Sequence, residues 1–167
     1  MQPVALAHVP ADPIYDVVGI GNALVDVIAH AAEDFLFAHQ LQKGSMTLIE
    51  ADRAVHLYRA LGQAIEMSGG SAANTMTGVA SFGGAAAYIG KVGDDELGSV
   101  FGHDLRAVGV SFRAATSNDG AATGRCIIVV TPDAERTMNT FLGASSLLAP
   151  DDVDLDVAAT DLRDAVA

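Results

Sequence analysis

Two consecutive glycines, Gly69 and Gly70, stand directly before a run of small residues with helical spacing. Glycine lets the backbone approach a neighbour closely, and the unpaired N–H groups of a first helical turn can donate to a ligand's oxygens. The pattern predicts a tight turn at residues 68–71 and a helix at residues 72–82, with Asn74 about one turn in. The same turn also occurs without a ligand, so a structural role and a binding role both stay open here.

The predicted small-residue helix contains Gly78 in its interior. Glycine at such a position costs about 1 kcal/mol relative to alanine. We therefore expect another part of the chain to pack closely against Gly78.

Strand and helix patterns alternate on both sides of the glycine turn. The expected strands are residues 15–20, 24–28, 46–49, 86–92, 125–131 and 136–141. The expected helices are residues 33–42, 51–61, 72–82 and 94–108, the last of them capped by Asp94. Such alternation predicts an α/β domain with a mainly parallel sheet. The strand around Asp26 and the hairpin at residues 125–141 do not fit a plain doubly wound order, and they predict a small antiparallel extension.

Length and charge limit the possible partners. A chain of 167 residues, half of them apolar, fits one domain with a sizeable core. Its 9 Lys and Arg against 21 Asp and Glu give a formal charge of −12, which disfavours nucleic acid and anionic membranes as partners. We expect a cytoplasmic protein, a disordered leader at residues 1–13 and a folded part at residues 14–167.

Residues that could bind a metal do not form a site in the sequence. Cys126 is the only cysteine and lies in a strand pattern, so we expect a core residue. Asp94, Asp95 and Glu96 are adjacent, whereas calcium loops need acids at alternating positions, so helix capping explains them better. The five histidines are scattered, and we expect no metal site.

Gly19 and Gly21 begin what looks like a dinucleotide fingerprint. Leu24 stands where the third glycine belongs, and the following residues continue as a strand. The fingerprint needs a helix N-terminus for the pyrophosphate, so we expect no nicotinamide or flavin site.

Asn22 and Asp26 are polar residues among apolar neighbours. The vicinal hydroxyls of a sugar would satisfy both oxygens of a buried carboxylate. Alternatively, Asp26 caps a loop or pairs with a nearby base. Arg136, beside the hairpin turn, could approach a phosphate or could pair on the surface with Glu135 or Asp133.

Taken together, these segments resemble the ribokinase (phosphofructokinase B) family. Gly21-Asn22 with Asp26 is similar to the family's first substrate-binding segment. The run SGGSAANTMTGVASFGGAAAYIGKVGDDELGSVF, residues 68–101, resembles its N-terminal signature, and the hairpin TPDAERTMNTFLGAS, residues 131–145, is typical of it. The resemblance spans residues 15–150, and GIGNALVDV and ERTMNTFLGA point to the adenosine kinase branch.

The resemblance implies a ribokinase-like three-layer α/β sandwich with a mainly parallel central sheet and a small β-lid. The lid strands would be those near residues 26–29 and 46–49 and the hairpin. Arg136 would lie near the path of the transferred phosphoryl group, and Met138 and Leu142 would contribute to an apolar base pocket. The residues that would hold the substrate are Asn22, Asp26, Gly69, Gly70, Ser71, Asn74, Met138 and Leu142.

The implied reaction is transfer of the ATP γ-phosphate to a primary hydroxyl of a sugar or nucleoside, with adenosine favoured and Mg²⁺ assisting. Family members use an Asp base in a G-A-G-D motif and a magnesium-associated N-x-x-E pattern, and neither occurs here. We therefore expect the base, the ATP site and the C-terminal half of the fold to lie beyond Ala167, and the 167-residue chain to be inactive. The alternative is a non-catalytic nucleoside- or sugar-binding remnant, or one that self-associates through its lid strands.

Overall fold

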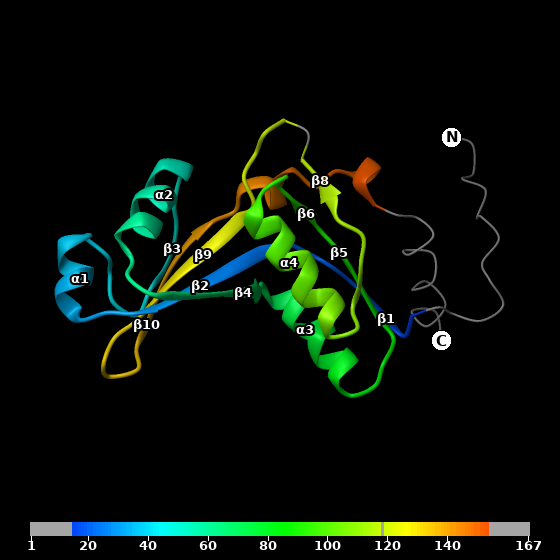
Figure 1. Ribbon diagram of the computed structural model, residues 1–167, viewed down its shortest axis with the longest axis horizontal. Helices are drawn as coiled ribbons and strands as arrows, with labels where there is room; N and C mark the ends of the chain where they lie inside the picture. Colours follow the sequence, from blue (N-terminus) through cyan, green and yellow to red (C-terminus); the bar gives the residue numbers. More distant parts are fainter. Residues whose placement is uncertain (1–14, 118, 154–167) are drawn as a thin grey trace, which may run out of the picture.

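The computed structural model describes residues 15–117 and 119–153, so the predicted leader at residues 1–13 lies outside the described residues. Figure 1 shows two regions, a body around β1 and β5 and a sheet that extends away from it. The strands are β1 (Val17–Ile20), β2 (Leu24–His30), β3 (Met46–Leu48), β4 (Ala64–Gly69), β5 (Ala86–Ile89), β6 (Lys91–Val92), β7 (Ser111–Phe112), β8 (Ala115–Thr116), β9 (Gly124–Val130) and β10 (Arg136–Phe141). The helices are α1 (Glu33–Ala38), α2 (Ala51–Ala60), α3 (Ser71–Ser81), α4 (Glu96–Ala107) and the 3-10 helices η1 (Gly143–Leu147) and η2 (Pro150–Asp152).

The body contains a parallel sheet in the order β1-β5-β7, which confirms the expected parallel arrangement. Helices α3 and α4 pack on this sheet (Figure 1). In α4, Leu97, Phe101 and Leu105 recur every four residues and therefore share one buried face. Phe101 packs edge-on against Phe112 of β7, with ring centroids 5.2 Å apart. These residues belong to a hydrophobic core that also includes Val25 and Val27 of β2.

The second sheet has the strand order β3-β10-β9-β2-β4, and we call it the lid sheet. It contains every strand expected in the lid, but the expected antiparallel extension is a mixed sheet, antiparallel in only part of its pairing. β2 pairs with β9, and β3 with β10, in parallel, whereas β9–β10 and β2–β4 are antiparallel. The reason is the connection: β2 and β9 are separated by the whole α3–α4 body, and such a crossover permits parallel pairing.

β4 was missed in the sequence, although its residues Ala64–Gly69 alternate in burial as an edge strand does. The lid sheet adjoins the body at one row of paired residues, in which Leu24 pairs with Gly69 on one side and with Gly124 on the other. We call this row the root of the lid sheet. Its opposite end, near His30 and the β9–β10 turn, is the tip.

Three predicted boundaries need correction. The strand expected at residues 86–92 is divided into β5 and β6 at Gly90. The helix expected to reach residue 42 ends at Ala38, because Gln40 has a φ of 52° that no α-helix accommodates. The cap of α4 is Asp95, whose carboxylate accepts the N–H of Gly98 at 2.9 Å, and not Asp94.

The expectation of close packing at Gly78 was also wrong. Apart from its two chain neighbours and the backbone of its own helix, no described residue has an atom within 4 Å of a Cβ placed there. In residues 15–117 and 119–153, no helix has the length and apolar character needed to cross a membrane. The cytoplasmic location stays a prediction.

Candidate substrate-binding site

Asp26 and Gly69 meet at the root of the lid sheet. Asp26 pairs with Met67 across β2 and β4, which places Gly69 on the diagonal of the same face. A Cβ at position 69 would stand 2.5 Å from Oδ2 of Asp26. Only glycine therefore lets the carboxylate lie over the end of β4.

Gly70 connects β4 to α3 and lies against the Asn22 backbone. Its φ is 88°, and a Cβ there would be 2.8 Å from the carbonyl oxygen of Asn22. Gly70 is the N-cap of α3 and supplies no side-chain hydrogen bond to the helix. We call Asn22, Asp26, Gly69, Gly70 and Ser71 the Asp26 cluster.

Ser71 and Asn74 are both exposed on the first turns of α3. The N–H of Asn74 donates to the carbonyl of Gly70 at 2.9 Å, so the helical ladder begins there and the earlier N–H groups of the helix remain outside it. The structure thus brings the sequence-predicted residues Asn22, Asp26, Gly69 and Gly70 together at the start of α3.

Burial raises the pKa of the Asp26 carboxyl, and this effect outweighs that of the positive charge of Arg136, which lowers the pKa. No hydrogen bond from residues 15–117 or 119–153 reaches the Asp26 carboxylate. A half-buried carboxylate to which no described residue donates is well suited to accept hydrogen bonds from the hydroxyls of a neutral ligand.

Apolar side chains surround Asp26 on the open face of the lid sheet. Ladder partners share a face, so the register places Met138 of β10 and Met46 of β3 on the Asp26 side. The large exposed side chains of this face are Met46 at 57%, Leu48 at 61%, Ile65 at 66% and Met67 at 46%. Ile65 and Met67 belong to β4, so the sequence analysis missed them together with that strand. Their alternation with Glu66 and Ser68 is the pattern that could have predicted the strand.

Leu142 and Arg136 lie at opposite ends of β10. Leu142 follows β10 directly at the root and is half-buried. Arg136 is the first residue of β10, near the tip, and is exposed on the Asp26 face. Among the described residues no ion pair joins Arg136 to Asp133 or Glu135, and Asp133 bonds Lys43 at 2.6 Å.

The remaining sequence candidates behave as structural residues. Gly21 leads into strand β2 and not into a helix, so this glycine is not followed by the helix N-terminus that a dinucleotide fingerprint needs. Cys126 is buried and accepts a hydrogen bond from Thr140 Oγ1 at 3.3 Å. Within the described part of the chain, no group of three or more His, Cys, Asp and Glu could hold a metal ion.

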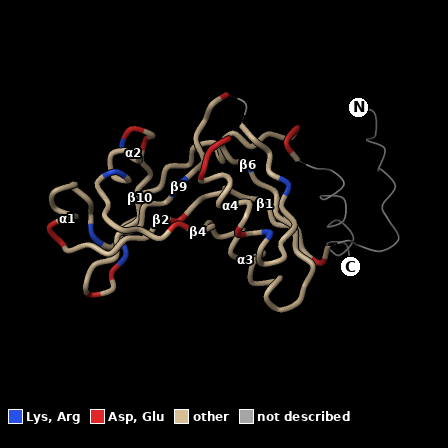
Figure 2. The backbone as a smooth tube through the Cα atoms, in the orientation of Figure 1, with Lys and Arg blue, Asp and Glu red and all other residues tan. Residues whose placement is uncertain are grey.

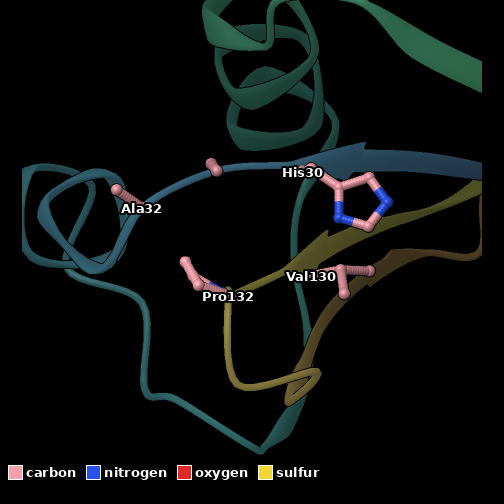
Figure 3. Close-up of a pocket in the computed structure, with 5 residues that line it drawn as sticks. His30, Ala32, Val130 and Pro132 are labelled. Atoms are coloured by element: carbon pink, nitrogen blue, oxygen red, sulfur yellow. The ribbon is translucent and has the colours of Figure 1, made fainter.

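A separate pocket lies at the tip of the lid sheet, away from the Asp26 cluster. Figure 3 shows His30, Ala32, Val130 and Pro132 around it. His30 ends β2, whereas Leu24 at the other end of the same strand belongs to the root. In the described chain, the Lys and Arg residues are spread along several elements (Figure 2).

Comparison with known proteins gives one consistent family. The sequence pattern of the pfkB family carbohydrate kinases matches residues 44–166. A probable fructokinase-4 of Arabidopsis thaliana is 36% identical over 95 residues, which cover 56% of this chain and 29% of the relative.

Solved structures give the same fold. The adenosine kinase from Sinorhizobium meliloti is 54% identical with a TM-score of 0.78, over 86% of this chain and 44% of that one. A probable sugar kinase protein from Rhizobium etli is 48% identical with a TM-score of 0.79, over 87% and 44%. The likeness confirms the ribokinase-like α/β fold expected from the sequence. The chain spans less than half the length of each of these proteins.

Proposed function

The chain belongs to the PfkB family of carbohydrate kinases, and on this basis we propose that it carries the substrate-binding part of an ATP-dependent sugar or nucleoside kinase, with adenosine as the favoured substrate. The observation that carries the proposal is the Asp26 carboxylate, held over Gly69 at the start of α3 with no described hydrogen-bond donor. The likeness to an adenosine kinase at 54% identity supports the nucleoside over a simple sugar.

In this proposal, Asp26 accepts hydrogen bonds from ribose hydroxyls and Asn22 adds an amide to them. The first N–H groups of α3, beginning at Ser71, donate to the same hydroxyl oxygens, and Asn74 reaches them from the next turn. The apolar residues Met138 and Leu142 contact the base. Apolar surface beside a few convergent polar groups is typical of sites for small ligands with one hydroxylated and one flat aromatic part.

ATP and Mg²⁺ are part of the proposal but not of the described site. The family reaction moves the γ-phosphoryl group of ATP to a substrate hydroxyl oxygen. The described residues contain no group of three or more His, Cys, Asp and Glu that could hold a metal ion, and we derive no step through ATP or Mg²⁺. Arg136, exposed on the Asp26 face, stays the candidate for approaching the transferred phosphate.

Calorimetric titration of the 167-residue chain with adenosine, ribose and fructose, without ATP, tests the binding proposal. We expect adenosine to bind more tightly than ribose, and fructose least tightly. Asp26→Ala should abolish the heat of binding, whereas Asp34→Ala, which removes an exposed acid on α1, should not change it. Binding of adenosine that is unaffected by Asp26→Ala would disprove the assignment of this site.

We also propose that a polypeptide of these 167 residues does not transfer phosphate, because it lacks the G-A-G-D motif. Incubation with ATP, Mg²⁺ and adenosine should yield no AMP above the level of a reaction without protein. AMP formation would refute this part and leave the binding proposal intact.

The exposed apolar face supports a second proposal, self-association through the lid sheet. Met46, Leu48 and Ile65 are each more than half exposed on one face, and covering such a surface is favourable in water. Light scattering should show a discrete dimer that Ile65→Lys converts to a monomer. A monomer at all concentrations would exclude this association.

A further inference from the structure

Helix α4 of the body packs on β2 and β4 of the lid sheet, and it also forms hydrogen bonds to this sheet at two points near its root. Oδ2 of Asp104 accepts the backbone N–H of Ser68, in β4, at 2.8 Å. Nine residues earlier, Asp95 accepts the N–H of Thr123, directly before β9, at 2.9 Å. One helix therefore positions both the β4 edge and the β9 strand.

The two attachments differ in strength. Asp95 also accepts Oγ1 of Thr123 at 2.5 Å and the N–H of Gly98, and Thr123 is fully buried. Asp104 makes one bond to the lid sheet, and its side chain is 32% exposed, with Oδ1 3.4 Å from Nδ1 of His103. Asp95 thus belongs to a small buried network, whereas the Asp104 bond is single and partly open to water.

The Asp104 bond acts on the residue next to the Asp26 cluster. β4 is the outermost strand of the lid sheet, so the N–H of Ser68 that donates to α4 has no second strand available to it. Ser68 precedes Gly69, and Gly69 is the residue whose α-carbon lies against the Asp26 carboxylate. A movement of Ser68 away from α4 would therefore carry Gly69 away from Asp26.

We infer that Asp104 is a positioning residue for the Asp26 cluster, because its carboxylate fixes Ser68 and thereby keeps Gly69 against Asp26. Asp104 itself does not face the proposed ligand. The consequence for ligand affinity rests on the proposed function, whereas the effect on the geometry of the cluster does not.

Three measurements on the 167-residue chain and its variants test the inference. Amide hydrogen exchange measures how well the Ser68 and Gly69 N–H groups are protected from solvent, and NMR titration measures the pKa of the Asp26 carboxyl. Neither measurement needs a ligand. Calorimetry with adenosine reports affinity. The variants are Asp104→Ala, which removes the acceptor, and Asp104→Asn, which keeps a weaker neutral acceptor. The matched control is Asp94→Ala, an exposed acid just before the same helix.

For Asp104→Ala we expect the amide exchange rate of Ser68 to rise about tenfold. This is the loss of protection expected when one charge-assisted hydrogen bond is removed. The Asp26 pKa should fall toward its ordinary value as water reaches the carboxylate, and adenosine affinity should fall about tenfold. Asp104→Asn should show smaller changes of the same sign, and Asp94→Ala none. If Asp104→Ala does not fold, the difference between Asp104→Asn and the unmodified chain decides the question.

Unchanged exchange at Ser68 in the Asp104 variants would overturn the inference. So would faster exchange with an unchanged Asp26 pKa, because Asp104 would then hold only the strand edge. If the unmodified chain binds no adenosine, the proposed function fails, and exchange and titration still decide the role of Asp104.

Discussion

The Asp26 carboxylate and the α-carbon of Gly69 are in direct contact across β2 and β4, and no side chain fits between them. A methyl group at position 69 would overlap the carboxylate, so Gly69→Ala must move either Asp26 or the end of β4. We expect this variant to lose at least about tenfold in adenosine affinity, equivalent to about 1.4 kcal/mol. Calorimetry with adenosine measures the effect.

The control for that variant is Gly62→Ala. Apart from its two chain neighbours, no described residue has an atom within 4 Å of a Cβ at Gly62, and Gly62 is not in the positive-φ region. Its adenosine affinity should equal that of the unmodified chain. Equal affinity of Gly69→Ala and Gly62→Ala would contradict the contact described here.

Gly78→Ala should stabilise the chain by about 1 kcal/mol, because alanine has the higher helix propensity and the described neighbours leave room for its methyl group. Urea unfolding followed by circular dichroism measures the change. A loss of stability would mean that a close neighbour exists at Gly78 after all.

Asp26→Asn should raise stability at neutral pH. Burial raises the Asp26 pKa above the ordinary value of 3.8, so ionisation of this group destabilises the folded state once the pH exceeds that value. The gain of the variant should therefore be largest above the raised pKa and shrink as the pH falls toward 3.8. Urea unfolding over a pH series measures it, with Asp34→Asn on the exposed surface of α1 as the reference. A gain that does not change with pH would show that the charge of Asp26 is not its cause.

Asp95→Ala should destabilise the chain by about 2 kcal/mol, since it removes the cap of α4 and leaves the Thr123 donors without an acceptor. Burial alone would raise the pKa of Asp95, but the hydrogen bonds from Thr123 and Gly98 outweigh it and lower the pKa. The stabilisation by Asp95 is therefore complete above pH 3.8 and is lost as the pH falls through the lowered pKa.

Thermal unfolding at neutral pH measures the loss in Asp95→Ala. Asp94→Ala is the matched control, and it should change the midpoint little because Asp94 is exposed and does not cap α4. A larger loss of stability in Asp94→Ala than in Asp95→Ala would show that Asp94 is the cap, as expected from the sequence.

Several elements could be read from local patterns. The apolar spacing of α4, the glycine turn before α3 and the turn between β9 and β10 are encoded within a few residues, and the structure has them where they were expected. The cap of α4 was misplaced by one residue, because Asp94 and Asp95 are chemically equivalent in sequence and only Thr123 distinguishes them. β4 was missed because a short half-exposed edge strand has a weak pattern.

The sequence alone determined the family and the α/β class, and it pointed to Asn22, Asp26, Gly69 and Gly70 as candidate binding residues, since these inferences depend on residue types at short spacing. The tertiary structure decided that β2 and β4 pair so that Asp26 covers Gly69, and that Asp104 of a distant helix holds Ser68. Strand register and contacts between remote elements depend on how the whole chain packs, and spacing along the sequence does not specify them.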